Sequence, residues 1–356
     1  MTLLKPLLTL SHNLILVFIG ILGIGFIIGF HELGHFLFGK LFKIKTPAFA
    51  IGFGPKIYQR KIGETNFSIG AIPLGGYVES DKESFESKPY WQKMLVLAGG
   101  ISFNLLFAYM TFCFLFMVGL PKTKFLYPIN TVPTIGRVAQ DESLAQLNIK
   151  KGDKIIAIDQ VKIKNNSLFL LKKLKTLEKK KVILTIERNG EIENIAIEAK
   201  PLLQAFGKMQ ISFTFAKPQG LPFFTSIKKG INLTNTYIIN TLMIFKHMFV
   251  KRDTSALGGP ILIISETVKG ASKGITIFLL LLAIISVSLA VINLIPLPIL
   301  DGGQALLYTI EAVIRRKLSD KTKETIFIIS WIFMLILFIL ISTRDVWRIA
   351  KSVTKK

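Results

Sequence analysis

The sequence has almost no cysteine and few acidic residues. The single cysteine, Cys113, lies in an apolar run, so the chain has neither a disulfide framework nor a cysteine-based zinc site. We expect Cys113 to pack in a transmembrane helix. Lysine and arginine number 45 against 22 aspartates and glutamates, a net charge of +23. No motif of interleaved aromatic and basic residues accompanies this charge, so we interpret it as attraction to anionic lipid headgroups or as a compositional bias, not as nucleic-acid binding.

Histidine is scarce as well, with four in 356 residues. Two of them form the motif HELGH, His31 to His35, inside an apolar stretch that runs from about Leu14 to Phe38. On a helix, residues four apart project from one face, where two imidazoles can bind one Zn²⁺ with Glu32 beside it. An HExxH motif also occurs by chance in proteins that bind no metal. Ionisable groups in a membrane-spanning helix are costly and usually functional, so this setting favours the metal site.

Long apolar runs indicate the class of protein to which this sequence belongs. Hydrophobic residues make up 51% of the chain and the mean hydropathy is +0.51, which indicates a polytopic membrane protein with some soluble mass. Four stretches are long enough to span a bilayer: 14–30 continuing through HELGH, 94–120, 275–300 and 325–342. The first is not a cleavable signal peptide, because it lacks a small-residue cleavage site. A weaker stretch, 231–250, is expected to form an amphipathic helix.

Four crossings place residues 39–93 and 301–324 on one side of the membrane, and both termini with 120–274 on the other. The short segments of the first side hold nine and five lysines and arginines, against one and five in the two termini, so we expect that side to be cytoplasmic. His31 lies about 17 residues into its span, roughly 25 Å along a helix, near the cytoplasmic end. The third span ends on the same side at the run from Asn293 to Gly303 (NLIPLPILDGG).

A third metal ligand is expected from this second run. A catalytic zinc site usually takes three protein ligands, and the two remaining histidines, His12 and His247, fall on the opposite side of the membrane. Asp301 follows two prolines that interrupt the helix, at the same depth as the HELGH histidines. The alternative for Asp301 and its two glycines is a turn that caps a helix.

These motifs together resemble the site-2 protease family of intramembrane zinc metalloproteases, and most closely its RseP-like bacterial branch. HELGH and NLIPLPILDGG are similar to the paired signature of that family. Other runs are similar to family landmarks in the same order, so the resemblance extends from about Leu14 to Arg348. These runs are IGFGP (51–55), AIPLGGYV (71–78), GGISFN (99–104), LGGP (257–260) and RDVWR (344–348).

The resemblance implies roles for individual residues. His31, His35 and Asp301 would bind Zn²⁺, and Glu32 would be the general base of peptide hydrolysis. A second group would contact substrate, although a buried asparagine could equally join two helices and the small residues around Asn104 could serve helix packing. This second group is Asn293, Asn104, Gly75 and Gly76.

Residues 49–79 are expected to contain a β element. The stretches 57–60 and 66–72 are rich in β-prone residues, and a turn segment with Gly63 separates them. An exposed strand edge beside the metal could bind a substrate that has unwound into an extended form, the role proposed for this region in the family. The alternative is an amphipathic loop on the membrane surface.

A soluble domain lies between the second and third spans. Residues 133–201 resemble one PDZ domain, with strands at 154–158 and 182–187 and a hairpin turn at Arg188–Glu191. Asn148 stands where such domains usually have glycine, and it tolerates a left-handed conformation better than most residues do. The family resemblance implies that this domain excludes substrates with bulky extracytoplasmic parts; peptide binding and a spacer role are alternatives.

The expected fold is thus a polytopic α-helical membrane protein of about four transmembrane helices, with a membrane-associated β element and an inserted, mostly β, PDZ-like domain. We expect four segments: a first membrane half, the PDZ domain, an extracytoplasmic linker with an amphipathic helix, and a second membrane half. Their bounds are 1–120, 121–205, 206–274 and 275–356.

The resemblance implies a multi-pass protein of the bacterial inner membrane with its active site near the cytoplasmic side. The expected activity is zinc-dependent cleavage of single-span membrane proteins, such as anti-sigma factors and signal-peptide remnants, after another protease has shortened them. One alternative is a different membrane metallopeptidase whose third ligand is a glutamate further along a helix. The other is a non-catalytic scaffold that binds peptides through its PDZ domain. The oligomeric state does not follow from the sequence.

Overall fold

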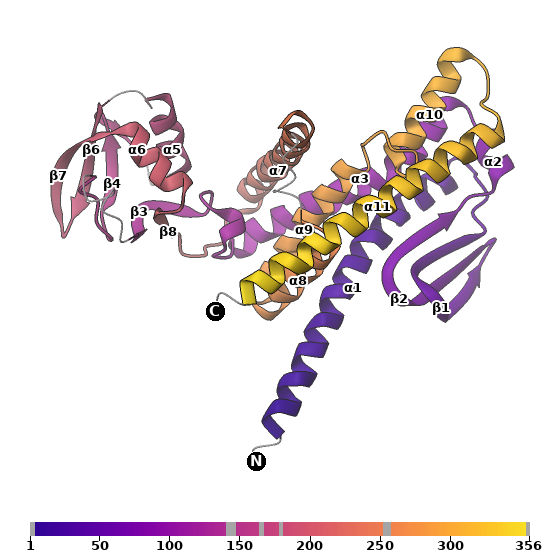
Figure 1. Ribbon diagram of the computed structural model, residues 1–356, viewed down its shortest axis with the longest axis horizontal. Helices are drawn as coiled ribbons and strands as arrows, with labels where there is room; N and C mark the ends of the chain where they lie inside the picture. Colours follow the sequence, from indigo (N-terminus) through magenta and orange to yellow (C-terminus); the bar gives the residue numbers. More distant parts are fainter. Residues whose placement is uncertain (1–3, 140–146, 164–166, 178–180, 252–257, 354–356) are drawn as a thin grey trace. The chain divides into compact units, whose positions relative to one another are not determined.

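The computed structural model describes residues 4–139, 147–163, 167–177, 181–251 and 258–353 (Figure 1). The chain forms two compact units. The first combines residues 1–117 with 221–356, and the second comprises 118–220.

Within the described residues of the first unit, four helices are long and apolar enough to cross a membrane. This confirms the expected fold class, and the chain is a multi-pass membrane protein. The third helix ends at Ile292, earlier than the sequence predicts, because Pro296 and Pro298 cannot continue a helix. The four helices are α1 (Leu4–Leu41), α3 (Tyr90–Val118), α9 (Ile275–Ile292) and α11 (Asp320–Val353).

Other helices connect these four. The predicted amphipathic helix is present and is longer than expected, as α7 (Phe223–Lys251). α7 packs on α3, where a Cβ on Gly230 would lie 2.7 Å from the Cys113 backbone nitrogen, so glycine permits the close approach. The other connecting helices are α2 (Lys82–Glu86), α8 (Pro260–Ser272) and α10 (Asp301–Ile314).

Two long strands form a hairpin beside α1 (Figure 1). They are β1 (Ala48–Ile62) and β2 (Thr65–Glu79), and Gly63 takes a positive φ in the turn between them. Both strands are longer than predicted, because they bend back and the start of β1 pairs twice. Ala48 is a partner of Asn66 and also of Glu79, so the last residues of β2 run along the start of β1.

Buried Asp345 joins the last transmembrane helix to α8. Its Oδ1 accepts a hydrogen bond from the Gly259 N–H (3.2 Å), and its Oδ2 accepts one from the Leu262 N–H (3.0 Å). The free N–H groups at a helix start favour a carboxylate, and Gly259 has no side chain to cap its own helix. The runs LGGP and RDVWR therefore meet in space; Leu257 lies outside the described residues.

The second unit contains, among its described residues, a six-stranded antiparallel sheet in the order β7-β6-β4-β3-β8, with β5 beside β4. The predicted hairpin turn is present, with Asn189 and Gly190 at positive φ between β6 and β7. Asn148 takes the expected left-handed conformation, at a φ of 48°. The elements are β3 (Thr131–Val138), β4 (Lys154–Ile158), β5 (Val161–Lys162), α5 (Ser167–Thr176), β6 (Lys181–Arg188), β7 (Glu191–Glu198), α6 (Ala199–Gly207) and β8 (Ile211–Phe215).

This unit extends past the boundary at 205 that the sequence suggests. β8 pairs with β3 along its length, from Thr131 opposite Phe215 to Val138 opposite Ile211. Residues 206–220 thus belong to the compact unit and not to a linker. Its core is mostly aliphatic, with fully buried Ile158, Leu170 and Leu184, and also contains the stacked rings of Phe206 and Phe213.

Candidate metal centre

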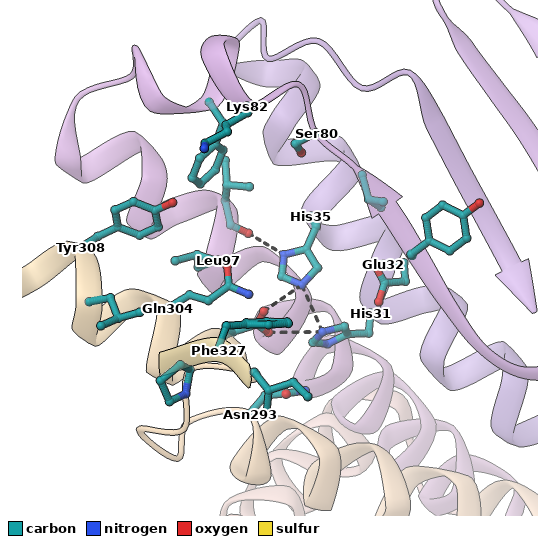
Figure 2. Close-up of a pocket in the computed structure, with 18 of the residues that line it drawn as sticks. His31, Glu32, His35, Ser80, Lys82, Leu97, Asn293, Gln304, Tyr308 and Phe327 are labelled. Carbon is teal, nitrogen blue, oxygen red and sulfur yellow. Dashed lines mark hydrogen bonds and ion pairs between the residues drawn. The ribbon is translucent and has the colours of Figure 1, made fainter. Parts of the chain in front are cut away.

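The HELGH motif lies on α1, where the helix backbone touches α3. A Cβ on Gly34 would lie 2.9 Å from the Gly100 nitrogen, so only glycine permits this crossing. Phe30, directly before the motif, packs against Phe103 and Phe107 of α3. The rings of His31 and His35 project from one face of α1, as the spacing predicts (Figure 2).

Asp301 reaches the same point from the start of α10. The chain between α9 and α10 makes tight turns, and the Gly302 N–H donates to the Asn293 carbonyl over 2.7 Å. A Cβ on Gly302 would lie 2.6 Å from the Leu294 carbonyl carbon. Glycine therefore lets this loop fold onto the start of α10, and that contact aims the Asp301 carboxylate at the histidines.

Three ligand atoms converge at this point. His31 Nε2 is 3.3 Å from Asp301 Oδ2, His35 Nε2 is 3.3 Å from Asp301 Oδ1, and the two Nε2 atoms are 3.1 Å apart. Ligands about 2.1 Å from a tetrahedral zinc ion are about 3.4 Å from one another, so the spacing fits a zinc site. Asp301 Oδ2 is buried without a hydrogen-bond partner in the described chain, as a ligand atom would be.

The hydrogen bond of His35 shows why a cation belongs there. His35 Nδ1 is 2.8 Å from the backbone carbonyl oxygen of Val96 on α3. A carbonyl only accepts, so Nδ1 carries the proton, and the Nε2 of a neutral His35 presents a lone pair to His31 and Asp301. Lone pairs and a carboxylate at this separation repel one another unless a cation or a proton lies between them.

Gly100 of α3 leaves space for both imidazoles. A Cβ at this position would lie 2.6 Å from His31 Cε1 and 2.7 Å from His31 Nε2, and would overlap His35 Nε2. We therefore expect Gly100→Ala to displace the two rings and weaken zinc binding about 10- to 100-fold, since overpacking costs roughly 1–3 kcal/mol. Zinc retained per protein against graded chelator, measured by atomic emission, checks this.

Gly39→Ala is the matched control for this variant. Gly39 lies two turns beyond His31 on α1, and a Cβ there would make an ordinary contact, 3.5 Å from Thr46 Cγ2. Its zinc content should equal that of the wild type. Equal zinc retention by Gly100→Ala and the wild type would contradict the packing argument.

Glu32 faces the end of strand β2. A Cβ on Gly76 would be 3.2 Å from Glu32 Cγ, and the backbone of Val78 hydrogen-bonds the Glu32 carboxylate. Figure 2 shows the Glu32 side chain beside the two imidazoles. The carboxylate is thus next to the converging ligand atoms and next to an exposed segment of β2.

The remaining predicted site residues lie in different environments. Asn293 and Gly76 line the same cavity as the histidines, whereas Gly75, at a φ of 133°, packs against the Phe53 ring. Asn104 contacts His31, with its Nδ2 3.2 Å from His31 Nδ1. The structure therefore places Asn293, Gly76 and Asn104 at the cavity, with Asn104 also against the His31 ring.

A cavity of about 880 Å³ surrounds the site. Its lining combines apolar side chains such as Leu97 and Phe327 with polar ones that include Ser80, Lys82 and Gln304 (Figure 2). An extended peptide segment needs apolar walls and polar groups for its backbone, so the cavity suits such a ligand.

A partly buried ionic cluster holds the far end of α10; we call it the α10 anchor. It consists of Glu86, Lys93, Tyr308, Glu311 and Lys323. Glu86 pairs with Lys93 (2.9 Å) and Lys323 (3.4 Å), and Lys323 also pairs with Glu311 (2.8 Å). The Tyr308 hydroxyl donates to Glu86, and both ammonium groups lie over the Tyr308 ring. The anchor ties the helix of Asp301 to α2, α3 and α11.

The positive and negative charges within the anchor offset one another. Burial would raise the pKa of Glu86, but the hydrogen bond and charge of Lys93, with those of Lys323, outweigh it and hold that pKa below its usual value. Burial and the neighbouring Glu86 carboxylate raise the pKa of the Tyr308 hydroxyl. Two carboxylates and two ammonium groups form a neutral set, which is how buried charges are tolerated.

Comparisons with known proteins agree with the chemistry of this site. The model of Peptidase family M50 matches residues 19–337. A protein from Clostridium acetobutylicum named "Putative zinc metalloprotease" is 31% identical over 344 residues, which cover 93% of this chain and 97% of that protein. A protein from Fusobacterium nucleatum, also named "Putative zinc metalloprotease", is 31% identical over 342 residues, which cover 93% of this chain and 98% of that protein. These names and the His-His-Asp cluster imply zinc as the metal.

Proposed function

This chain belongs to peptidase family M50, and from that premise we propose that it is an intramembrane endopeptidase that cleaves single-span membrane proteins within or beside their transmembrane helices. The observation that carries the proposal is the convergence of His31, His35 and Asp301 on helices α1 and α10 of a multi-pass membrane protein. Intramembrane proteases need catalytic groups at membrane depth, and α1 supplies two of them inside a span.

His31, His35 and Asp301 hold the zinc in this proposal. Zinc supplies Lewis acidity when bound, which polarises the scissile carbonyl and makes water a better nucleophile. The three residues would supply the three protein ligands that are usual for a catalytic zinc site. The α10 anchor keeps the Asp301 helix against α3, so the carboxylate stays in reach of both rings.

Glu32 acts as the general base. Its carboxylate lies next to the ligand atoms, where it takes a proton from the attacking water and passes it to the leaving amine. The backbone of Val78 holds the carboxylate, so its position is fixed by β2 as well as by α1.

The substrate binds along the end of β2. Peptide bonds in a helix are hydrogen-bonded and shielded, so the substrate must unwind before cleavage. Gly76 and Val78 border the cavity, where an unwound segment adds to the strand edge through its backbone. Asn293 hydrogen-bonds the substrate backbone from the opposite wall, and Gly75 allows the strand to bend around Phe53.

The second unit acts as a filter in this proposal. We assign it as a PDZ domain of the RseP-like branch, from the resemblance of residues 133–201 and from the six-stranded sheet and the helices α5 and α6 among its described residues. It would exclude proteins with large extracytoplasmic parts, so the substrates are proteins that another protease has shortened, such as anti-sigma factors and signal-peptide remnants. The active site then faces the cytoplasmic side of the bacterial inner membrane.

We expect removal of zinc to abolish cleavage and re-addition to restore it. Purified, zinc-loaded protein is incubated in detergent with candidate single-span membrane proteins, and product masses locate the cut. Protein stripped by chelator should give no product above background, and one equivalent of zinc should restore the cut inside or beside the transmembrane segment. Cleavage that continues in fully stripped protein would contradict the proposal.

A further inference from the structure

The side-chain amide of Asn104 contacts His31 through its nitrogen, while its oxygen has no partner among the described residues. Asn104 lies on α3, is 1% exposed, and its side-chain Nδ2 is 3.2 Å from His31 Nδ1. Its Oδ1 is buried and has no hydrogen-bond partner in the part of the chain that the structure describes. A buried amide oxygen without a partner costs roughly 1–3 kcal/mol, so this arrangement needs an explanation.

The chemistry of His31 supplies the explanation. Its Nε2 faces Asp301 and His35, and a nitrogen that binds a metal must be unprotonated. The proton of the neutral ring is then on Nδ1, which needs an acceptor. An amide N–H₂ cannot accept it. The oxygen and nitrogen of an asparagine amide differ little in shape, and rotating this amide by half a turn places Oδ1 against Nδ1–H.

We propose that Asn104 is a positioning residue for His31: its Oδ1 accepts the Nδ1–H of the ring and holds Nε2 unprotonated and aimed at the metal position. This inference rests on the proposed zinc function and replaces the substrate-contacting role that the sequence suggested for Asn104. The half-turn pairs the orphaned Oδ1 with the His31 Nδ1–H.

The neighbouring contacts support this assignment. The Val96 carbonyl plays the same part for His35, so α3 supplies an acceptor to each imidazole from positions two turns apart. The Ser286 hydroxyl of α9 donates to the Asn104 backbone carbonyl over 2.8 Å, which fixes this turn of α3. Outer groups of this kind orient metal-binding histidines and typically change metal affinity about 10- to 100-fold when removed.

Two substitutions of Asn104 separate the acceptor role from substrate contact. Asn104→Asp keeps an oxygen acceptor, and Asn104→Leu keeps the volume without one. We expect Asn104→Leu to bind zinc about 10- to 100-fold more weakly, and Asn104→Asp to bind it within about threefold of the wild type. Zinc retention against graded chelator and the absorption spectrum of the cobalt-substituted protein are measured, because neither needs a substrate.

Thr111→Val is the matched control, since Thr111 is a buried polar residue on the same face of α3, two turns further along. It should bind zinc and cobalt as the wild type does. Wild-type zinc retention by Asn104→Leu, with only KM raised, would overturn the proposal in favour of substrate contact. Equal loss of zinc in Asn104→Asp and Asn104→Leu would overturn it as well.

The metal readouts also separate this inference from the proposed protease activity. If the wild type binds zinc but cuts no membrane protein, the proposed function fails, while the Asn104 series still decides the positioning role. If Asn104→Leu does not accumulate in the membrane, the acceptor role of Asn104 is tested with Asn104→Asp alone. Zinc retention within about threefold of the wild type supports that role, and a loss of 10-fold or more overturns it.

Discussion

Replacing Glu32 by glutamine is expected to leave zinc bound and to abolish peptide hydrolysis. Glutamine has the size and hydrogen-bonding reach of glutamate, so the contact with the Val78 backbone and the packing beside Gly76 persist. The neutral amide cannot take a proton from water, and loss of a general base typically costs about 10²- to 10⁴-fold in rate. Product formation and zinc content are measured on the same preparation.

Glu64→Gln is the control for Glu32→Gln. Glu64 lies in the turn between β1 and β2, is exposed, and belongs to the same unit. It should cleave and bind zinc as the wild type does. Undiminished cleavage by Glu32→Gln would rule out Glu32 as the base. It would favour the alternative of a different membrane metallopeptidase.

Asp301→Ala is expected to lose both zinc and activity. The substitution removes the one negative charge among the three ligand atoms and leaves two imidazole nitrogens 3.1 Å apart. Two neutral ligands hold zinc poorly, so the loss of affinity should exceed the roughly 10- to 100-fold that changes in outer groups cause. Chelator titration followed by atomic emission gives the affinity, and the cleavage assay gives the rate.

This variant also tests the rival assignment of the third ligand. Thr309→Val, on the same helix, is the control for α10, because Thr309 bonds the Tyr90 hydroxyl and not the ligand cluster. If Asp301→Ala retains zinc and activity, the third ligand is another carboxylate, and the His31–Asp301 and His35–Asp301 contacts of 3.3 Å are ion pairs only.

Chain order and local spacing were enough to predict the positions of the histidines and Asp301. The four-residue spacing of His31 and His35 fixes their common helix face whatever surrounds them. Asp301 follows from counting crossings, because the two runs must end on the same side of the membrane. These inferences use periodicity and length, which tertiary packing seldom changes.

Groups that act through long-range contacts could not be predicted in this way. The Val96 carbonyl is a backbone atom and carries no sequence signal, and the role of Gly100 depends on which residues face it. The anchor joins Glu86 to Lys323, 237 residues apart. β8 was missed as a strand because its partner β3 lies more than 70 residues earlier in the chain. Pairing at such separations depends on the folded topology and not on local propensity.

The close crossing of α1 and α3 at Gly34 affects the order in which the site is assembled during synthesis. Both histidines and their two acceptors on α3 belong to the first 104 residues, so they come together once two spans have entered the membrane. Asp301 is synthesised almost 200 residues later. A nascent chain therefore holds the two imidazoles without the Asp301 carboxylate until α10 has been made, and the proposed zinc site is completed only after the second unit has had time to fold.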